Sequence, residues 1–202
     1  MKSCLVLQVI VILFVPSILQ SCKKKDTTPV TLNNERTMID TTPARNPFTH
    51  AKTWNNCIKP TNVSQDVMNQ DVINYYSYWR NTYLRSCDSI NQLYVEGEAT
   101  NSQIPSKGTS ESHGYGMIIS VLMAGYDVKA KANFDALYDF FDTHRSTINK
   151  ELMGWEVAED ERSNAFSSAT DGDMDIAYSL ILAHYQWGSS GRIHYLQEAQ
   201  DM

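Results

Sequence analysis

The chain has 202 residues, of which 42% are hydrophobic and 20% charged, and its 17 basic and 23 acidic side chains give a formal net charge of −6. This composition is typical of a globular protein and excludes disorder along the whole chain and the fibrous classes. It also argues against a nucleic-acid partner, because such a surface needs clustered Lys and Arg. A chain of this length forms one domain, or at most two.

The first segment has the features of an export signal. Lys2 supplies a positive charge, and the apolar run over 5–19 is shorter than the roughly 20 residues that cross a membrane. The run ends in Leu-Gln-Ser-Cys, which resembles a bacterial lipobox. We therefore expect a signal peptide over 1–21, lipidation of Cys22, and an exported lipoprotein at the outer membrane or cell surface, in contact with the membrane only through its lipid. Simple secretion and an uncleaved anchor remain alternatives.

The next segment, 22–52, begins with three lysines and continues rich in Thr, Pro and Asn, without an apolar period. Such a stretch cannot bury enough surface to offset its chain entropy, so we predict a flexible tether followed by a folded domain over 53–202. Cys57 and Cys87 then remain to form one disulfide or to stay as two thiols, and their spacing does not decide between these. Neither lies in a Cys-x-x-Cys motif, so we expect no metal or redox role for them.

The rest of the chain has helical periodicity, which predicts helices over 65–84, 114–125, 132–144, 173–187 and 192–202. Runs that alternate with a period of two between turns are absent, so we predict an all-α fold with long loops over 94–110 and 157–170. The pattern over 114–125 is apolar nearly all round and indicates a fully buried helix. Tyr75, Tyr76 and Trp79 share a helical stripe, which places them in the core. The last pattern stops at Met202 without a capping signal, which we interpret as a chain cut within a helix.

A first acidic motif covers residues 110–117, with the sequence Ser-Glu-Ser-His-Gly-Tyr-Gly-Met. Glu111 stands where the apolar helix is expected to begin, beside two glycines that allow other groups to approach closely. Burial there would favour the neutral, proton-donating form of its carboxyl group, which suits a general acid. The alternative is that Glu111 is a first-turn residue favoured by the helix dipole.

A second acidic motif places Asp171, Asp173 and Asp175 within five residues at a helix start. One carboxylate would satisfy the cap, whereas three repel one another unless something else uses them. Calcium is disfavoured, because the glycine is at the second position of the motif and no closing Glu follows, so we expect neither a metal nor a cofactor. Asp171 could face a bound polyol, and Asp173 and Asp175 could fix the local backbone.

Trp155 lies between the two acidic motifs, in a loop after a helix. Its ring could stack on a sugar or pack in the core, and the sequence leaves both open. Four segments, over 78–84, 110–117, 152–155 and 169–188, together resemble glycoside hydrolase family 8. The resemblance implies an (α/α)6 barrel, of which this chain would supply the first half only, and inverting cleavage of β-1,4 bonds in cellulose, β-glucan, chitosan or xylan.

The resemblance also implies residue roles. Glu111 matches the proton donor of the family, and Asp171 matches the aspartate that binds the sugar at the cleavage point. Trp155 matches a tryptophan that stacks on sugar rings. Tyr115 lies beside the acid and could position it. Ser112 stands where many members have Gly, which resembles the chitosanase and β-glucanase branch.

An inverting hydrolase also needs a carboxylate base about 6.5–9.5 Å from the acid. The resemblance implies that this base comes from the second half of the barrel, because the catalytic domain of the family is roughly twice as long as this chain. We therefore expect the 202-residue chain alone to be inactive. Two other classes remain: a non-catalytic glycan-binding lipoprotein of the cell surface, and a different α/α-barrel enzyme such as a polysaccharide lyase. A lyase is disfavoured because its acidic substrates suit a basic cleft, whereas this chain has a net negative charge.

Overall fold

The computed structural model describes residues 40, 42–49, 58–87, 91–97, 106–159 and 167–202. They contain helices α1 (Gln65–Tyr83), α2 (Ser110–Leu122), α3 (Ala130–Thr143), α4 (Thr170–Trp187) and α5 (Tyr195–Asp201), and strands β1 (Leu84–Cys87), β2 (Gln92–Val95), β3 (Ser106–Thr109) and β4 (Glu156–Ala158). The expected signal peptide, Cys22, Cys57 and most of the expected tether lie outside the described residues. Among those that are described, no helix is both long and apolar enough for a membrane crossing.

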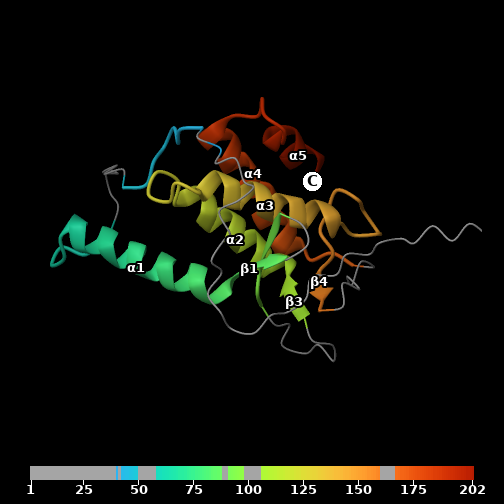
Figure 1. Cartoon of the computed structure of the whole chain (residues 1–202), viewed down its shortest axis with the longest axis horizontal. Coiled ribbons are helices and arrows are strands. Elements are labelled where there is room, and N and C mark those ends of the chain that lie inside the picture. The colour runs from blue at the N-terminus through green and yellow to red at the C-terminus, as the bar shows by residue number, and fades with distance from the viewer. Residues whose placement is uncertain (1–39, 41, 50–57, 88–90, 98–105, 160–166) are drawn as a thin grey trace, which may run out of the picture.

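All five predicted helices are present, and α2 begins four residues earlier than its apolar pattern indicates. In Figure 1, α2, α3 and α4 form the centre of the molecule, α1 extends to one side, and α5 lies beside α4. Most of the fully buried side chains of the core come from the three central helices. Its fully buried members include Met117, Phe134, Leu137, Phe141, Ile176 and Leu180. Burying one such side chain contributes about 1.5–3 kcal/mol.

The helical fold also contains two short strand pairs that the sequence pattern did not indicate: β1 pairs with β2 and β3 pairs with β4, both antiparallel. Both predicted long loops contain part of a strand pair. The strands are only three or four residues long, and β2 and β4 are buried at every position. A short strand buried on both faces shows no alternation of polar and apolar residues, so its sequence carries no period of two.

The prediction of a fully buried helix is wrong for α2, which leaves Tyr115 and Leu122 more than half exposed. The buried side of α2 carries small residues at Gly114, Gly116 and Ser120, so it packs closely against its neighbours while the other side stays open. In α1, Tyr76 and Trp79 are buried as predicted, but Tyr75 is 68% exposed. Consecutive helical residues point about 100° apart, so a stripe of adjacent aromatics cannot all face one core.

Residues 42–49 fall in the expected tether, yet they pack on the helices. The Arg45 amide donates to the Gln186 carbonyl (3.1 Å), and the Phe48 amide donates to the Ala124 carbonyl (2.6 Å). The Gln186 side chain accepts from the Asn46 amide (2.7 Å) and donates to its carbonyl (2.9 Å). We call this segment the strap. The predicted boundary between tether and folded domain, at residue 53, is therefore too late. The sequence did not indicate the strap, because backbone hydrogen bonds hold it and it has no apolar period.

Cys87, at the end of β1, is disulfide-bonded, and its partner lies outside the described residues. This excludes the alternative in which Cys87 remains a thiol. The pairing of Cys87 with Cys57 stays a prediction.

Candidate active site

The first turn of α2, which carries Glu111, is fixed by a reciprocal cap. The Thr109 hydroxyl accepts from the Ser112 amide (3.3 Å), and the Ser112 hydroxyl accepts from the Thr109 amide (3.1 Å). Such a capping box satisfies two backbone donors that the helix itself leaves open. Ser112, which the sequence analysis linked to the substrate branch, therefore has a structural role in holding the turn of Glu111.

Two glycines bring the starts of α2 and α4 together. A Cβ on Gly114 would lie 2.6 Å from the Asp175 Cβ, and a Cβ on Gly172 would lie 2.7 Å from the Glu111 amide nitrogen. No side chain larger than hydrogen fits at either position. Because Gly172 directly follows Asp171, this close crossing places Glu111 and Asp171 at neighbouring helix starts.

Trp155 is attached to both acidic segments through its backbone. Its carbonyl accepts from the Ser110 amide (2.9 Å), one residue before Glu111, and its amide donates to the Ser167 carbonyl (3.2 Å), shortly before α4. The indole is 37% exposed, so it is not a core side chain. Of the two alternatives for Trp155, the structure therefore favours a ring that is available to a ligand beside the acids.

Tyr115 lies one turn after Glu111 on α2, close enough for the negative charge of Glu111 to act on its hydroxyl. The negative charges of Glu111, first, and then of Asp175 and Asp171 raise the pKa of Tyr115. These four side chains therefore share one electrostatic environment. Glu111 itself is exposed, so the burial that was expected for its side chain is not found. Its position in the first turn agrees with the helix-dipole alternative.

The three aspartates of α4 have different surroundings. Asp173 is buried, and its Oδ1 accepts from the Met153 amide (3.0 Å), so it fixes the local backbone as predicted. Burial raises the pKa of Asp173, while the hydrogen bonds from Met153 and Ser168 oppose that rise. Asp171 is exposed, and among the described residues its carboxylate accepts only from the amide of Gly172 (2.9 Å), which leaves it open to a ligand. No group of His, Cys, Asp or Glu in the described part of the chain is arranged to hold a metal ion.

Residues 67–202 match the sequence model of the glycosyl hydrolases family 8. The chain belongs to this family. It is 48% identical over 163 residues to an endoglucanase from Bacillus sp. (strain KSM-330), covering 77% of this chain and 35% of that relative. It is 41% identical over 158 residues to a β-glucanase from Niallia circulans, covering 77% of this chain and 37% of that protein.

Solved structures agree with this assignment. The apo structure of a β-1,3-1,4-glucanase from Paenibacillus sp. X4 superimposes with a TM-score of 0.68 at 42% identity, covering 77% of this chain and 40% of that one. Rex8A from Paenibacillus barcinonensis complexed with xylose, at 18% identity and a TM-score of 0.56, shows the fold alone. The resemblance to family 8 is thus confirmed, and the five helices form part of its (α/α)6 barrel. The chain spans roughly a third to two fifths of the length of these relatives.

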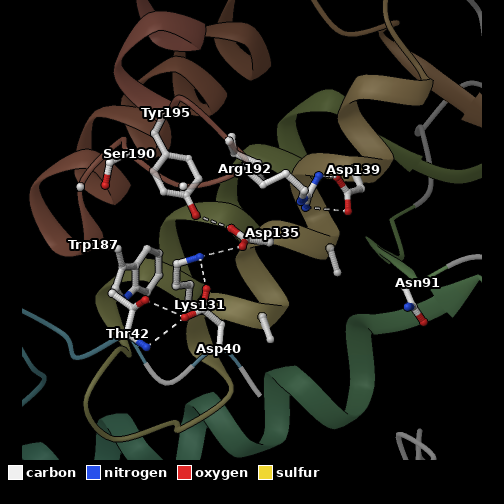
Figure 2. Close-up of a pocket in the computed structure, with 15 residues that line it drawn as sticks. Asp40, Thr42, Asn91, Lys131, Asp135, Asp139, Trp187, Ser190, Arg192 and Tyr195 are labelled. Atoms are coloured by element: carbon white, nitrogen blue, oxygen red, sulfur yellow. Dashed lines mark hydrogen bonds and ion pairs between the residues drawn. The ribbon is translucent and has the colours of Figure 1, made fainter. Parts of the chain in front are cut away.

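The family 8 chain also has a pocket of about 490 Å³ between α3 and the segment that joins α4 to α5 (Figure 2). None of the predicted site residues lines it. Its charges are paired with one another: the Lys131 Nζ lies 2.6 Å from an Asp40 oxygen and 2.8 Å from an Asp135 oxygen, and Arg192 makes two contacts of 2.7 and 3.0 Å with Asp139. The starts of α2 and α4, and not this pocket, are therefore our candidate active site.

Asp175 was expected, like Asp173, to be able to fix the local backbone, but no backbone group in the described residues donates to its carboxylate. The available signal was the four-residue spacing from Asp171, which puts both carboxylates on one face of α4. Glu111, Tyr115, Asp171 and Trp155 lie on neighbouring segments, and the roles that the resemblance implies for them stay predictions.

Proposed function

We propose that the protein hydrolyses β-1,4 bonds in a β-glucan with inversion, and that Glu111 is its general acid. The observation that supports this most directly is the crossing of α2 and α4 at Gly114 and Gly172. It puts two exposed carboxylates, Glu111 and Asp171, at adjacent helix starts with the exposed Trp155 attached to both segments. Glycoside hydrolysis needs a carboxyl group that can protonate the leaving oxygen, and a carboxylate and an aromatic face beside it suit the binding of a sugar ring.

In this reaction the Glu111 carboxyl group gives its proton to the glycosidic oxygen as the bond from that oxygen to the anomeric carbon breaks. Water attacks the anomeric carbon from the opposite face, and its proton goes to a carboxylate base. The Tyr115 hydroxyl, one turn along α2 from Glu111, helps to position the acid. Asp171 accepts from sugar hydroxyls, and the Trp155 ring stacks on a neighbouring sugar. We assign the base to a part of the protein outside these 202 residues, because the relatives are more than twice as long.

The preferred substrate is a β-glucan, because relatives at 41–48% identity carry the names endoglucanase and β-glucanase. Chitosan is the second candidate. Three carboxylates act on Tyr115 at the site, and a negative cleft attracts a cationic polymer. Parallel assays on barley β-glucan and on chitosan distinguish the two substrates by their ratios of kcat/KM.

We further propose that the protein is a lipoprotein of the cell envelope, anchored through Cys22. The apolar run over 5–19 and the Leu-Gln-Ser-Cys sequence support this. Metabolic labelling with palmitate is expected to mark the natural protein, and Cys22→Ala is expected to remove the label and move the protein to the soluble fraction. A labelled Cys22→Ala variant would contradict the anchor.

The deciding experiment compares the natural gene product with its Glu111→Gln variant on barley β-glucan. Loss of the general acid is expected to lower kcat about 10²–10⁴-fold. Proton NMR of the first products is expected to show the α-anomer. First appearance of the β-anomer would contradict inversion. Binding without release of reducing ends would favour the glycan-binding alternative, and products that absorb in the ultraviolet would favour a lyase. The 202-residue chain alone is expected to be inactive.

A further inference from the structure

Asp175 lies on the same face of α4 as Asp171, one turn further along the helix. On α2, Glu111 and Tyr115 have the same four-residue spacing. The two helices cross where the Asp175 Cβ faces Gly114, so the two pairs of side chains lie side by side. Asp175 is therefore next to the proposed acid and sugar-binding residues and not on a remote surface.

The carboxylate of Asp175 has no donor in the described part of the chain. It is half-buried, yet neither a hydrogen bond nor an ion pair with any described residue reaches it. Asp173, two residues earlier, is held by the Met153 amide. Burial, first, and the negative charge of Asp171 raise the pKa of Asp175. The Asp175 oxygens still reach water, and a ligand hydroxyl beside Asp171 can take the place of that water.

We propose that Asp175 is a further substrate-binding residue, whose carboxylate accepts a hydrogen bond from a hydroxyl group of the glucan bound beside Asp171. Sugar hydroxyls are neutral donors, so they can satisfy the carboxylate without bringing a charge into the site. Substrate would then contact α4 at two successive turns, through Asp171 and Asp175. Two contacts fix both the position and the orientation of the sugar relative to the helix. This inference rests on the proposed glucan hydrolysis.

The alternative is that Asp175 serves only the crossing of α2 and α4. Its Cβ fills the space that Gly114 leaves open, and this contact does not need the carboxylate. Asp175→Asn keeps the Cβ and the shape but removes the charge, whereas Asp175→Ala also removes the acceptor. The two variants therefore separate packing from hydrogen bonding to sugar.

The experiment uses the natural gene product carrying Glu111→Gln, so that substrate is bound but not cleaved. Isothermal titration with a mixed-linkage β-glucan tetrasaccharide measures Kd for this parent and for the same protein with Asp175→Asn, Asp175→Ala or Asp66→Asn. The last is the control, because Asp66 is exposed on α1 and its change removes the same charge. We expect about 10–100-fold weaker binding for Asp175→Ala, a smaller loss for Asp175→Asn and no change for Asp66→Asn.

A second readout follows the Asp175 carboxyl carbon by ¹³C NMR with and without the tetrasaccharide. A hydroxyl donor stabilises the ionised form, so the pKa of Asp175 is expected to fall when sugar binds. Unchanged Kd in both Asp175 variants, with or without a lower Tm, would overturn the inference and leave the proposed hydrolysis intact. A natural gene product that neither cleaves nor binds β-glucan would overturn the proposed function and this inference with it.

Discussion

Gly172 of α4 lies directly against Ser110 of α2: a Cβ on Gly172 would stand 2.3 Å from the Ser110 Oγ. In an ordinary helix interior, Gly→Ala stabilises by up to about 1 kcal/mol. Here the added methyl group must push the two helices apart, which costs about 1–3 kcal/mol. We therefore expect Gly172→Ala to lower the free energy of unfolding in urea. Activity is expected to fall further still, because the methyl group also meets the Glu111 backbone.

The control for this variant is Gly191→Ala. A Cβ on Gly191 meets nothing within 4 Å, so its stability and activity are expected to match the parent. Equal stability of the Gly172 and Gly191 variants would show that α2 and α4 do not need the close crossing.

The acidic residues of the site could be predicted from sequence because they belong to short, contiguous motifs. Glu111 and Asp171 were placed at helix starts, and both are found there. What joins them could not be predicted. The strap and the strand pair of β3 and β4 depend on backbone hydrogen bonds between distant segments, which leave no periodic pattern. The open carboxylate of Asp175 likewise depends on what α2 presents to it, and only the packed structure shows that.

Trp155 is the next site residue to test, because its backbone and its side chain have separate roles. Trp155→Ala keeps both backbone hydrogen bonds, and the indole is exposed enough that its loss is expected to change stability by less than about 1 kcal/mol. Loss of the stacking face is expected to raise KM for β-glucan about tenfold while Trp155→Phe retains most of the affinity. Quenching of indole fluorescence by substrate checks the contact. A large fall in Tm with unchanged KM would assign Trp155 to packing instead.

The buried His113 is expected to make the stability of the fold sensitive to acid. It is fully buried on α2, and its Nε2 lies 2.9 Å from the Leu137 carbonyl, which can only accept, so Nε2 carries the proton. Its Nδ1 has no hydrogen-bond partner in the described part of the chain, and burial lowers the pKa of His113 from 6.5 to about 4. Below pH 6.5 the imidazole of His113 becomes protonated in the unfolded chain but stays neutral in the folded chain. Stability is therefore expected to fall as pH falls from 6.5 to 4, by about 3 kcal/mol in total.

The test is urea unfolding between pH 7.5 and pH 4 for the parent and for His113→Gln, which keeps a donor for Leu137. The parent is expected to lose more stability than the variant in this range. The Asp40 carboxylate, whose hydrogen bond from Lys131 lowers its pKa to about 2, loses its contribution only below its ordinary value of 3.8, so the two effects separate. Parallel pH profiles for the two proteins would contradict the role of His113.

Asp127, in the turn between α2 and α3, attaches α1 to the central helices. Its Oδ2 accepts from the Tyr76 hydroxyl (2.5 Å) and from Arg80 (3.1 Å), and its Oδ1 accepts from the Lys129 amide (2.8 Å). Because Asp127 and Tyr76 are buried, Asp127→Asn is expected to cost about 1.5–3 kcal/mol. Asp142→Asn is the control, since this carboxylate is 52% exposed in its pair with Arg145 and such pairs contribute about 0–1 kcal/mol. Similar losses in both variants would argue against the buried network.

The side chain of Gln186 holds the strap, residues 42–49, against α4. Gln186, on the last turn of α4, is buried and exchanges two hydrogen bonds with Asn46, while its Nε2 also lies 3.3 Å from the Val121 carbonyl. Gln186→Ala removes all three and leaves the Val121 carbonyl without that donor, so we expect a loss of about 1–3 kcal/mol. Limited proteolysis is expected to cut near residues 42–49 faster in the variant. Gln197→Ala is the control, because the Gln197 side chain bonds only to the exposed Asp201. If residues 42–49 were a free tether, Gln186→Ala would not change their rate of cleavage, whereas a docked strap becomes accessible only when its hydrogen bonds are removed.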